Sequence, residues 1–197
     1  MNTSPQPRSL RILLDEHRAL AAMLQSLTLL LRQHREHGSP PDFAVLRAML
    51  FYIDEFPERL HHPKESELLF PLVRARSPAA RAVLERLDHD HARGEWSIRE
   101  LQHALLAWEM MGEPRREAFE TAARDYTRFY LEHMRAEEEE VLPLAREVLQ
   151  PEDWAALDAA FTANRDPLAG HAPDERYRPV FLKILMTAPA PIGLGPA

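Results

Sequence analysis

Two stretches of the sequence carry the same arrangement of residues that could bind metal ions. Residues 61–74 read HHPKESELLFPLVR, and residues 133–146 read HMRAEEEEVLPLAR. In each stretch a histidine is followed four residues later by a glutamate: His61 with Glu65, and His133 with Glu137. Residues four apart lie on one face of an α-helix, so each pair presents an imidazole and a carboxylate together. Two such pairs are what a two-metal carboxylate site inside a helix bundle requires.

A single HxxxE motif has simpler explanations. It is commonly a surface ion pair, and the run from Glu137 to Glu140 would on its own suit a solvated acidic face. A plain helical scaffold with unrelated histidines is a third interpretation. Two copies in matched register, with more histidines on other core faces, favour the metal site instead.

Composition and periodicity predict that helices position these residues. The chain has 197 residues, enough for one domain with a full core, and only 6 glycines. We predict an all-α fold, an antiparallel up-down-up-down four-helix bundle in residues 9–150 that follows a flexible tail in residues 1–8. Long helices are expected near residues 9–37, 43–76, 78–111 and 114–149. Residues 151–197 are expected to add short helices near 151–165 and 177–187 and an extended tail, which we interpret as packing or an association surface.

Local signals mark where these helices begin and end. Gly38 and the prolines that follow it predict the end of the first helix. Asp42 suits the cap of the second helix and Ser77 the cap of the third. Pro57, Pro63 and Pro71 cost about 3 kcal/mol each inside an unassisted helix, so local bends are expected around His61.

Each long helix carries one histidine on its apolar stripe: His17, His61, His91 and His133. The predicted stripes of the second and fourth helices are Leu46, Leu50, Ile53, Pro57, His61, Glu65, Leu68 and Leu72, and Phe119, Ala122, Tyr126, Phe129, His133, Glu137, Glu140 and Leu144. The stripe of the third helix is a heptad of Leu84, Leu87, His91, Gly94, Ile98, Leu101, Leu105 and Trp108. A buried His17 satisfied by a backbone carbonyl is the alternative to a metal ligand there.

Neighbouring positions are interpreted differently. His62 points about 100° away from His61 and is expected at the rim, where its replacement would leave metal binding intact. His89 is expected in solvent. Gly94 lacks a side chain close to His91, which either leaves room for a small ligand or permits close helix approach. Glu140 is expected to have a structural role beside the site.

Charge and residue usage exclude several classes of function. The formal charge of −7, from 31 acidic against 24 basic residues, argues against nucleic acid or an anionic membrane as the main partner. There is no cysteine, so disulfides, thiolate metal sites and thiol catalysis are excluded. Met1 to Arg8 lack an apolar signal core, and no apolar run is long enough to span a bilayer. We therefore expect a cytoplasmic protein.

Four imidazoles and two carboxylates suit a pair of first-row metal ions. Iron is the metal that we expect, as two ions with an oxo or hydroxo bridge, although manganese and zinc also suit these donors. Two histidines per metal, two shared carboxylates and a bridging oxygen leave about one open position on each octahedral ion. A closed structural site would keep none.

The order of these motifs resembles the hemerythrin-like, or HHE cation-binding, superfamily over residues 10–150. The resemblance rests on a histidine, then HxxxE followed by Phe-Pro, then another histidine, then HxxxE followed by Leu-Pro. It implies that His17 and His61 bind one iron and that His91 and His133 bind the other. It also implies that Glu65 and Glu137 bridge the two ions. Ferritin-like di-iron proteins use Glu-x-x-His instead, a pattern that this chain lacks.

Two departures separate the chain from the oxygen-carrying hemerythrins. Those proteins have a fifth histidine where Leu87 stands, and an aspartate rather than Glu137 as the second bridge. The chain is thus more similar to four-histidine members linked to iron sensing, nitric oxide response and iron–sulfur cluster repair, although it has no cysteine-bearing segment like that of the repair proteins. We predict a non-heme di-iron protein that binds or reduces oxygen, nitric oxide or peroxide. The alternative is an iron- or redox-responsive sensor or adaptor without turnover.

Overall fold

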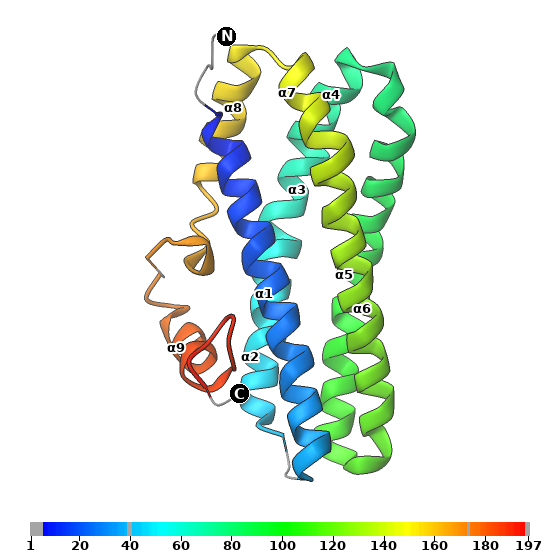
Figure 1. Ribbon diagram of the computed structural model, residues 1–197, viewed down its shortest axis with the longest axis vertical. Helices are drawn as coiled ribbons and strands as arrows, with labels where there is room; N and C mark the ends of the chain where they lie inside the picture. The colour runs from blue at the N-terminus through cyan, green and yellow to red at the C-terminus, as the bar shows by residue number, and fades with distance from the viewer. Residues whose placement is uncertain (1–5, 39–40, 173, 196–197) are drawn as a thin grey trace.

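The chain folds as an all-α bundle of four long helical segments, as predicted (Figure 1). The computed structural model describes residues 6–38, 41–172 and 174–195, and these contain helices and one isolated β-bridge, between Pro189 and Gly195. In these ranges no helix combines the length and the hydropathy needed to cross a membrane. The predicted tail falls mostly on residues 1–5, which lie outside the described ranges.

Each long segment of the bundle runs antiparallel to the next one along the chain (Figure 1). The first is α1 (Arg8–His37), and the third is α5 (Arg81–Met111), which follows the short 3₁₀ turn η3 (Pro78–Ala80). The second consists of α2 (Phe43–Ile53), η1 (Asp54–His61), α3 (His62–Lys64), η2 (Glu65–Leu69) and α4 (Phe70–Arg76). The fourth consists of η4 (Glu113–Arg115), α6 (Arg116–Ala136), η5 (Glu137–Val141) and α7 (Leu142–Val148). The extension adds α8 (Pro151–Thr162), η6 (Pro167–Ala169) and α9 (Arg178–Thr187).

The ends of these segments follow the predicted signals with one exception. Gly38 ends α1 in the left-handed conformation, at φ 64°, and its N–H donates to the carbonyl of His34. The Asp42 carboxylate caps α2 by accepting from the N–H groups of Ala44 and Val45. Ser77 and Pro78 occupy the predicted N-cap and first helical positions, but the Ser77 side chain makes no capping hydrogen bond.

Polar residues divide the core into two hydrophobic clusters. All eight heptad positions predicted for the third segment are buried in α5. Leu84 and Leu87 belong to one cluster, whereas Ile98 and the later heptad positions belong to the other. His91 lies between them, and the other three segments are interrupted in the same way. A layer of histidines and glutamates thus crosses the bundle at one level.

The predicted stripes of the second and fourth segments go wrong at the same point, directly after each glutamate. Leu68 and Glu140 are exposed, and the buried positions are instead Leu69 and Val141. The cause is a π-helical turn at each place, closed by the N–H of Phe70 to Glu65 and of Leu142 to Glu137. A proline follows each turn, Pro71 and Pro143, and it has no N–H for the usual i→i−4 bond. Because the π turn is wider than an α-helical turn, the next buried residue comes four positions after each glutamate. In a regular α-helix it would have come three positions after it.

The C-terminal extension packs along one side of the bundle, with α8 beside α1 and α9 beside α2 (Figure 1). The predicted extended tail is wrong, because the chain turns back after Ala188. The N–H of Gly195 donates to the carbonyl of Ala188, and the Ser26 hydroxyl donates to the carbonyl of Pro189. A Cβ at Gly195 would lie 2.0 Å from the carbonyl oxygen of Thr187, so only glycine fits this fold-back.

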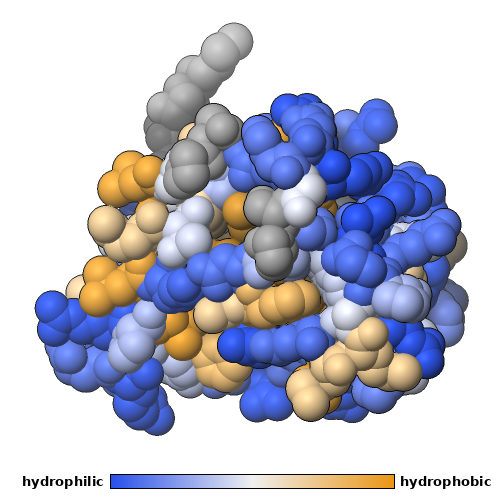
Figure 2. Space-filling model, turned by 90° about the horizontal axis from the view of Figure 1, so that it is seen from below, coloured by the Kyte–Doolittle hydropathy of each residue, from blue (hydrophilic) through white to orange (hydrophobic). Residues whose placement is uncertain are grey.

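One end of the molecule carries exposed apolar side chains. Leu182, Leu185 and Met186 of α9 and Leu194 of the tail are all exposed. Figure 2, which looks at the lower end of the bundle, shows apolar surface on the side where α9 lies in Figure 1.

Candidate metal centre

The structure brings the six predicted site residues together in the polar layer of the bundle. On one side, His61 Nε2 lies 3.2 Å from Glu65 Oε1, and His17 Nε2 lies 3.3 Å from Glu137 Oε2. All four residues are buried, and Glu65 and Glu137 are 0% and 1% exposed. The imidazoles of α1 and η1 therefore face one oxygen from each glutamate.

The other oxygens of the same glutamates face the second pair of histidines. His91 Nε2 lies 3.4 Å from Glu65 Oε2, and His133 Nε2 lies 3.3 Å from Glu137 Oε1. The two Nε2 atoms are 3.1 Å apart, too close for two ring nitrogens that both carry a proton. Each glutamate thus points one oxygen at each histidine pair, which is the arrangement of a carboxylate that bridges two ions.

The buried oxygens of this layer lack ordinary hydrogen bonds. Neither oxygen of Glu65 nor of Glu137 has a hydrogen-bond partner among the described residues, and His61 Nε2 has none either. Buried polar atoms are normally satisfied, and a buried carboxylate without a partner is costly. Nitrogen and oxygen donors of this kind, aimed at one another without bonding, fit metal ions between them.

His62 lies inside this layer, and the prediction that it sits at the rim is wrong. Its ring is buried, and its Nδ1 donates to Glu58 Oε2 at 3.1 Å. Burial, with the charges of His91 and His61, lowers the pKa of His62 well below 6.5. A helix buries a stripe at least 100° wide, so two consecutive residues can both point inward. His61 faces α1, and His62 faces α5 and α6.

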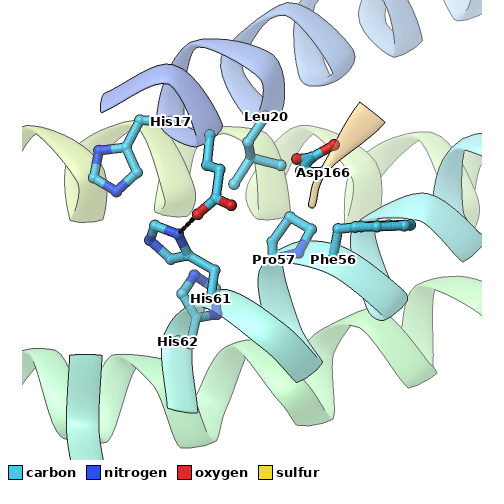
Figure 3. A pocket seen from close by; sticks show the side chains of 8 residues that line it. His17, Leu20, Phe56, Pro57, His61, His62 and Asp166 are labelled. Atoms are coloured by element: carbon cyan, nitrogen blue, oxygen red, sulfur yellow. Dashed lines mark hydrogen bonds and ion pairs between the residues drawn. The ribbon is translucent and has the colours of Figure 1, made fainter. Parts of the chain in front are cut away.

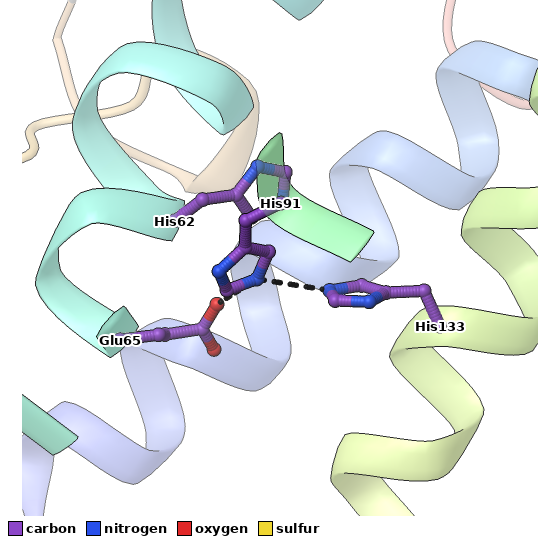
Figure 4. A group of neighbouring side chains, drawn as sticks. All are labelled: His62, Glu65, His91 and His133. Carbon is purple, nitrogen blue, oxygen red and sulfur yellow. Dashed lines mark hydrogen bonds and ion pairs between the residues drawn. The ribbon is translucent and has the colours of Figure 1, made fainter. Parts of the chain in front are cut away.

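His62 extends the donor set of the second histidine pair. Donor atoms of His62, Glu65, His91 and His133 all lie within 4.8 Å of one another, as do those of His17, His61 and Glu65 (Figure 4). The two halves of the centre are therefore unequal, with three imidazoles on one side and two on the other. This inequality breaks the twofold relation between the two halves of the sequence.

Gly94 makes room for a tyrosine and not for a ligand. A Cβ at this position would lie 1.7 Å from the hydroxyl of Tyr130. That hydroxyl donates to Glu58 Oε1 at 2.5 Å, and the hydroxyl of Tyr126 donates to the same oxygen at 2.7 Å. Close approach, one of the two interpretations of Gly94, is thus what the structure shows. The tyrosines hold Glu58, which in turn holds His62.

Four aromatic rings stack in a column beside the second pair. His62 stacks on Tyr130 at 5.3 Å and on His91 at 4.4 Å, with interplanar angles of 4° and 16°. Phe70 stacks on the other face of His91 at 5.5 Å and 11°. This ring column, formed by Phe70, His91, His62 and Tyr130, fixes the planes of two imidazoles.

Each of the four predicted histidine ligands has a polar neighbour at its outward nitrogen. His17 Nδ1 pairs with Glu138 at 2.9 Å, His61 Nδ1 with Glu16 at 2.7 Å, His91 Nδ1 with Ser66 at 2.8 Å, and His133 Nδ1 with the more distant Asp90 at 3.7 Å. A proton held on Nδ1 leaves the lone pair of Nε2 free for a metal ion. None of these four partners was among the predicted site residues. Their signal was adjacency, since each one directly precedes or follows a predicted ligand on a different helix.

Two other residues that were predicted not to be metal ligands, His89 and Glu140, lie at the surface. His89 is exposed, as predicted. Glu140 is also exposed and pairs with Arg86 at 3.1 Å, away from the histidines. Its position follows from the π turn at Glu137, which rotates the later residues relative to an ideal α-helix.

In the metal-free chain, the glutamates hold protons on the histidines. Burial, the largest single influence, opposes protonation of His133, but the charges of Glu137 and Glu65 and the contacts with Asp90 and Glu137 together raise the pKa of His133 from 6.5 to about 10. In the same way, burial lowers the pKa of His61, but the charges of Glu65 and Glu16 and the hydrogen bonds with both together raise it well above 6.5. Burial works against ionisation of Glu137, but the charge of His133 holds its pKa well below 4.5. A metal ion would replace these protons.

This charge pattern predicts how the stability of the metal-free protein depends on pH. Because the pKa of His133 is raised in the folded state, its contribution is full below about pH 6.5 and is lost as the pH rises to about 10. We expect the melting temperature in chelator to fall across that interval, as thermal unfolding followed by circular dichroism will show. His133→Gln should flatten the fall, whereas replacing the exposed His89 should leave it unchanged. A melting temperature that is constant from pH 6.5 to 10 contradicts the prediction.

Comparison with known proteins agrees with the geometry of the site. The chain matches the family model described as the hemerythrin HHE cation binding domain over residues 8–145. That range contains the whole histidine and glutamate layer and excludes α8 and α9. No curated protein matches the chain. The chain therefore belongs to the hemerythrin HHE cation-binding family.

Proposed function

We propose that this protein is a non-heme di-iron protein that binds or reduces a small ligand such as oxygen, nitric oxide or peroxide. One observation carries the proposal: Glu65 and Glu137 each direct one oxygen at each histidine pair, and none of the four oxygens has a hydrogen-bond partner among the described residues. Shared carboxylates offset the repulsion between two nearby cations. Such a pair of ions supplies Lewis acidity and electrons to a bound ligand.

In this proposal the two ions have different donors. His17 and His61 hold the first, His91 and His133 hold the second, and Glu65 and Glu137 join them. The corrected position of His62 adds a third imidazole to the second ion. The nitrogen and carboxylate donors suit iron, and they also suit manganese or zinc.

The open position then falls on the side of His17 and His61. A cavity of about 10 Å³ adjoins these two histidines on the side of Glu16 and Asp166, and its apolar wall is formed by Leu20, Phe56 and Pro57 (Figure 3). That volume is close to the minimum that one water molecule needs. A cavity of this size has room for about one water molecule and excludes large substrates.

A second candidate is a sensor or adaptor that depends on iron but does not turn over a substrate. The buried glutamates favour it as well, because ions that offset their burial would contribute directly to folding. In either case we propose a cytoplasmic protein whose partner is a small molecule, in keeping with the excess of acidic residues.

The first experiment measures iron and its response to ligands. We expect protein from iron-replete cells to contain about two iron ions per chain and to show the near-ultraviolet absorption of a diferric site. Nitric oxide, oxygen or peroxide should change that absorption. A large drop in melting temperature on chelation without turnover of peroxide favours the sensor. A chain that arrives without iron and cannot take it up refutes both.

Replacement of His62 tests the corrected donor set. His62→Ala removes an imidazole and uncovers the ring of His91, so we expect the affinity for one of the two ions to fall by about tenfold or more. Competition against a metal chelator measures this change. His89→Ala is the matched control, because His89 is exposed. Equal affinities in the two variants would remove His62 from the donor set.

Replacement of the bridging glutamates tests the two-ion arrangement. Glu137→Ala should disturb both ions, because its two oxygens face different histidine pairs. Glu140→Ala should leave the iron content unchanged, because Glu140 is exposed. Iron content and absorption distinguish the variants. Loss of the di-iron signal in Glu140→Ala but not in Glu137→Ala would show that the bridge has been misassigned.

A further inference from the structure

The C-terminal extension reaches the metal centre through Asn164. This residue follows α8 and is only 4% exposed. Its Nδ2 donates to Glu16 Oε2 at 3.0 Å, and its Oδ1 accepts from the ammonium group of Lys64. The two partners come from the first and second long segments, so the amide joins three parts of the chain.

These two partners fix the orientation of the amide. An ammonium group only donates, and an ionised carboxylate only accepts. A reversed amide would aim its NH₂ group at Lys64 and its oxygen at Glu16, and both contacts would be lost. Asn164 therefore presents a donor to Glu16 in a defined direction.

Glu16, held by Asn164, also contacts His61 of the centre. Glu16 Oε2 accepts from Asn164 and also from His61 Nδ1, at 2.7 Å. The other oxygen, Oε1, is buried without a hydrogen-bond partner among the described residues. Without the bond from Asn164, the carboxylate would be free to turn that oxygen toward the ring of His61 or into the adjoining cavity.

We propose that Asn164 is a positioning residue for the metal centre, which holds Glu16 and thereby sets the tautomer and orientation of His61. The inference rests on the proposed di-iron function and extends it, because it makes the C-terminal extension a part of the first metal site. Only one ion depends on this chain of contacts. The partners of His91 and His133, which are Ser66 and Asp90, belong to the bundle itself.

Other contacts anchor the extension independently of Glu16. The Ser9 backbone N–H and hydroxyl both donate to Asp158 at 2.6 Å, and the Tyr52 hydroxyl donates to Asp166 at 2.7 Å. These bonds lie on either side of Asn164 in the sequence. A substitution at Asn164 can therefore remove the contact with Glu16 while the extension stays docked.

The experiment compares Asn164→Leu with Tyr52→Phe in the full-length chain. Both remove buried hydrogen bonds between the extension and the bundle, but only the first removes a bond to Glu16. Each variant is loaded with Zn²⁺, and separately with Fe²⁺ under anaerobic conditions, and release to a chelator is followed. We expect Asn164→Leu to release one ion per chain about ten- to a hundredfold faster and to keep the other at the wild-type rate. Tyr52→Phe should release both at the wild-type rates.

A readout without metal separates this inference from the proposed function. In the metal-free protein, ¹H–¹⁵N spectra of the histidine side chains should show the His61 Nδ1 proton at low field, because it is bonded to a carboxylate. We expect this signal to move in Asn164→Leu and in Glu16→Gln, and to stay in Tyr52→Phe. An unmoved signal, unchanged release rates, or equal acceleration of both ions overturns the positioning role. A wild-type chain that binds no metal while the signal still moves refutes the di-iron function and leaves the positioning of His61 in place.

Discussion

The burial of two carboxylates away from water determines how the rest of this structure is arranged. Glu65 and Glu137 lie side by side at the centre of the bundle, and the groups nearest to their oxygens are histidine nitrogens. The effective penalty for burying one ion in a protein is several kcal/mol, so such a pair persists only when compensating charge surrounds it. Every long segment supplies part of that compensation, and the core is divided into two clusters to make room for it. The packing of the bundle and the geometry of the centre therefore depend on each other.

Much of the fold could be predicted because regular helices obey a simple period. The heptad of α5 was predicted at every position, and that segment contains no interior proline. The stripe of the second segment was predicted correctly as far as Glu65. In the fourth segment Ala122 and Phe129 are only partly buried, and both stripes failed directly after the glutamates. The π turns at Glu65 and Glu137 are the reason, since a period of 3.6 residues does not hold across a wider turn. The prolines predicted that the helices are irregular here, but the sequence could not show that the irregularity is a π turn.

The candidate site was predictable where it depends on one helix and unpredictable where it depends on the neighbours of that helix. The pairing of His61 with Glu65 follows from spacing alone. The inward position of His62 depends on α5 and α6 lying on its side of the bundle, which spacing does not determine. The contact of Glu16 with His61 and Asn164 likewise requires knowing that α1, the second segment and the extension meet at this point. The C-terminal extension showed no motif in the sequence because it contributes only one side chain to the centre, the amide of Asn164.

The ring column has a mechanical consequence for the whole molecule. Its four rings come from the second segment, α5 and α6, and they lie nearly parallel. Rotation of any of these helices about its axis would separate at least one stacked pair of rings. The column therefore opposes helix rotation. On the opposite side, the rings of His17, His61 and Phe161 meet at 51° and 81° and share no common stack. The stacked rings therefore restrain the second segment, α5 and α6 against rotation, whereas the tilted rings of α1 and α8 add no such restraint.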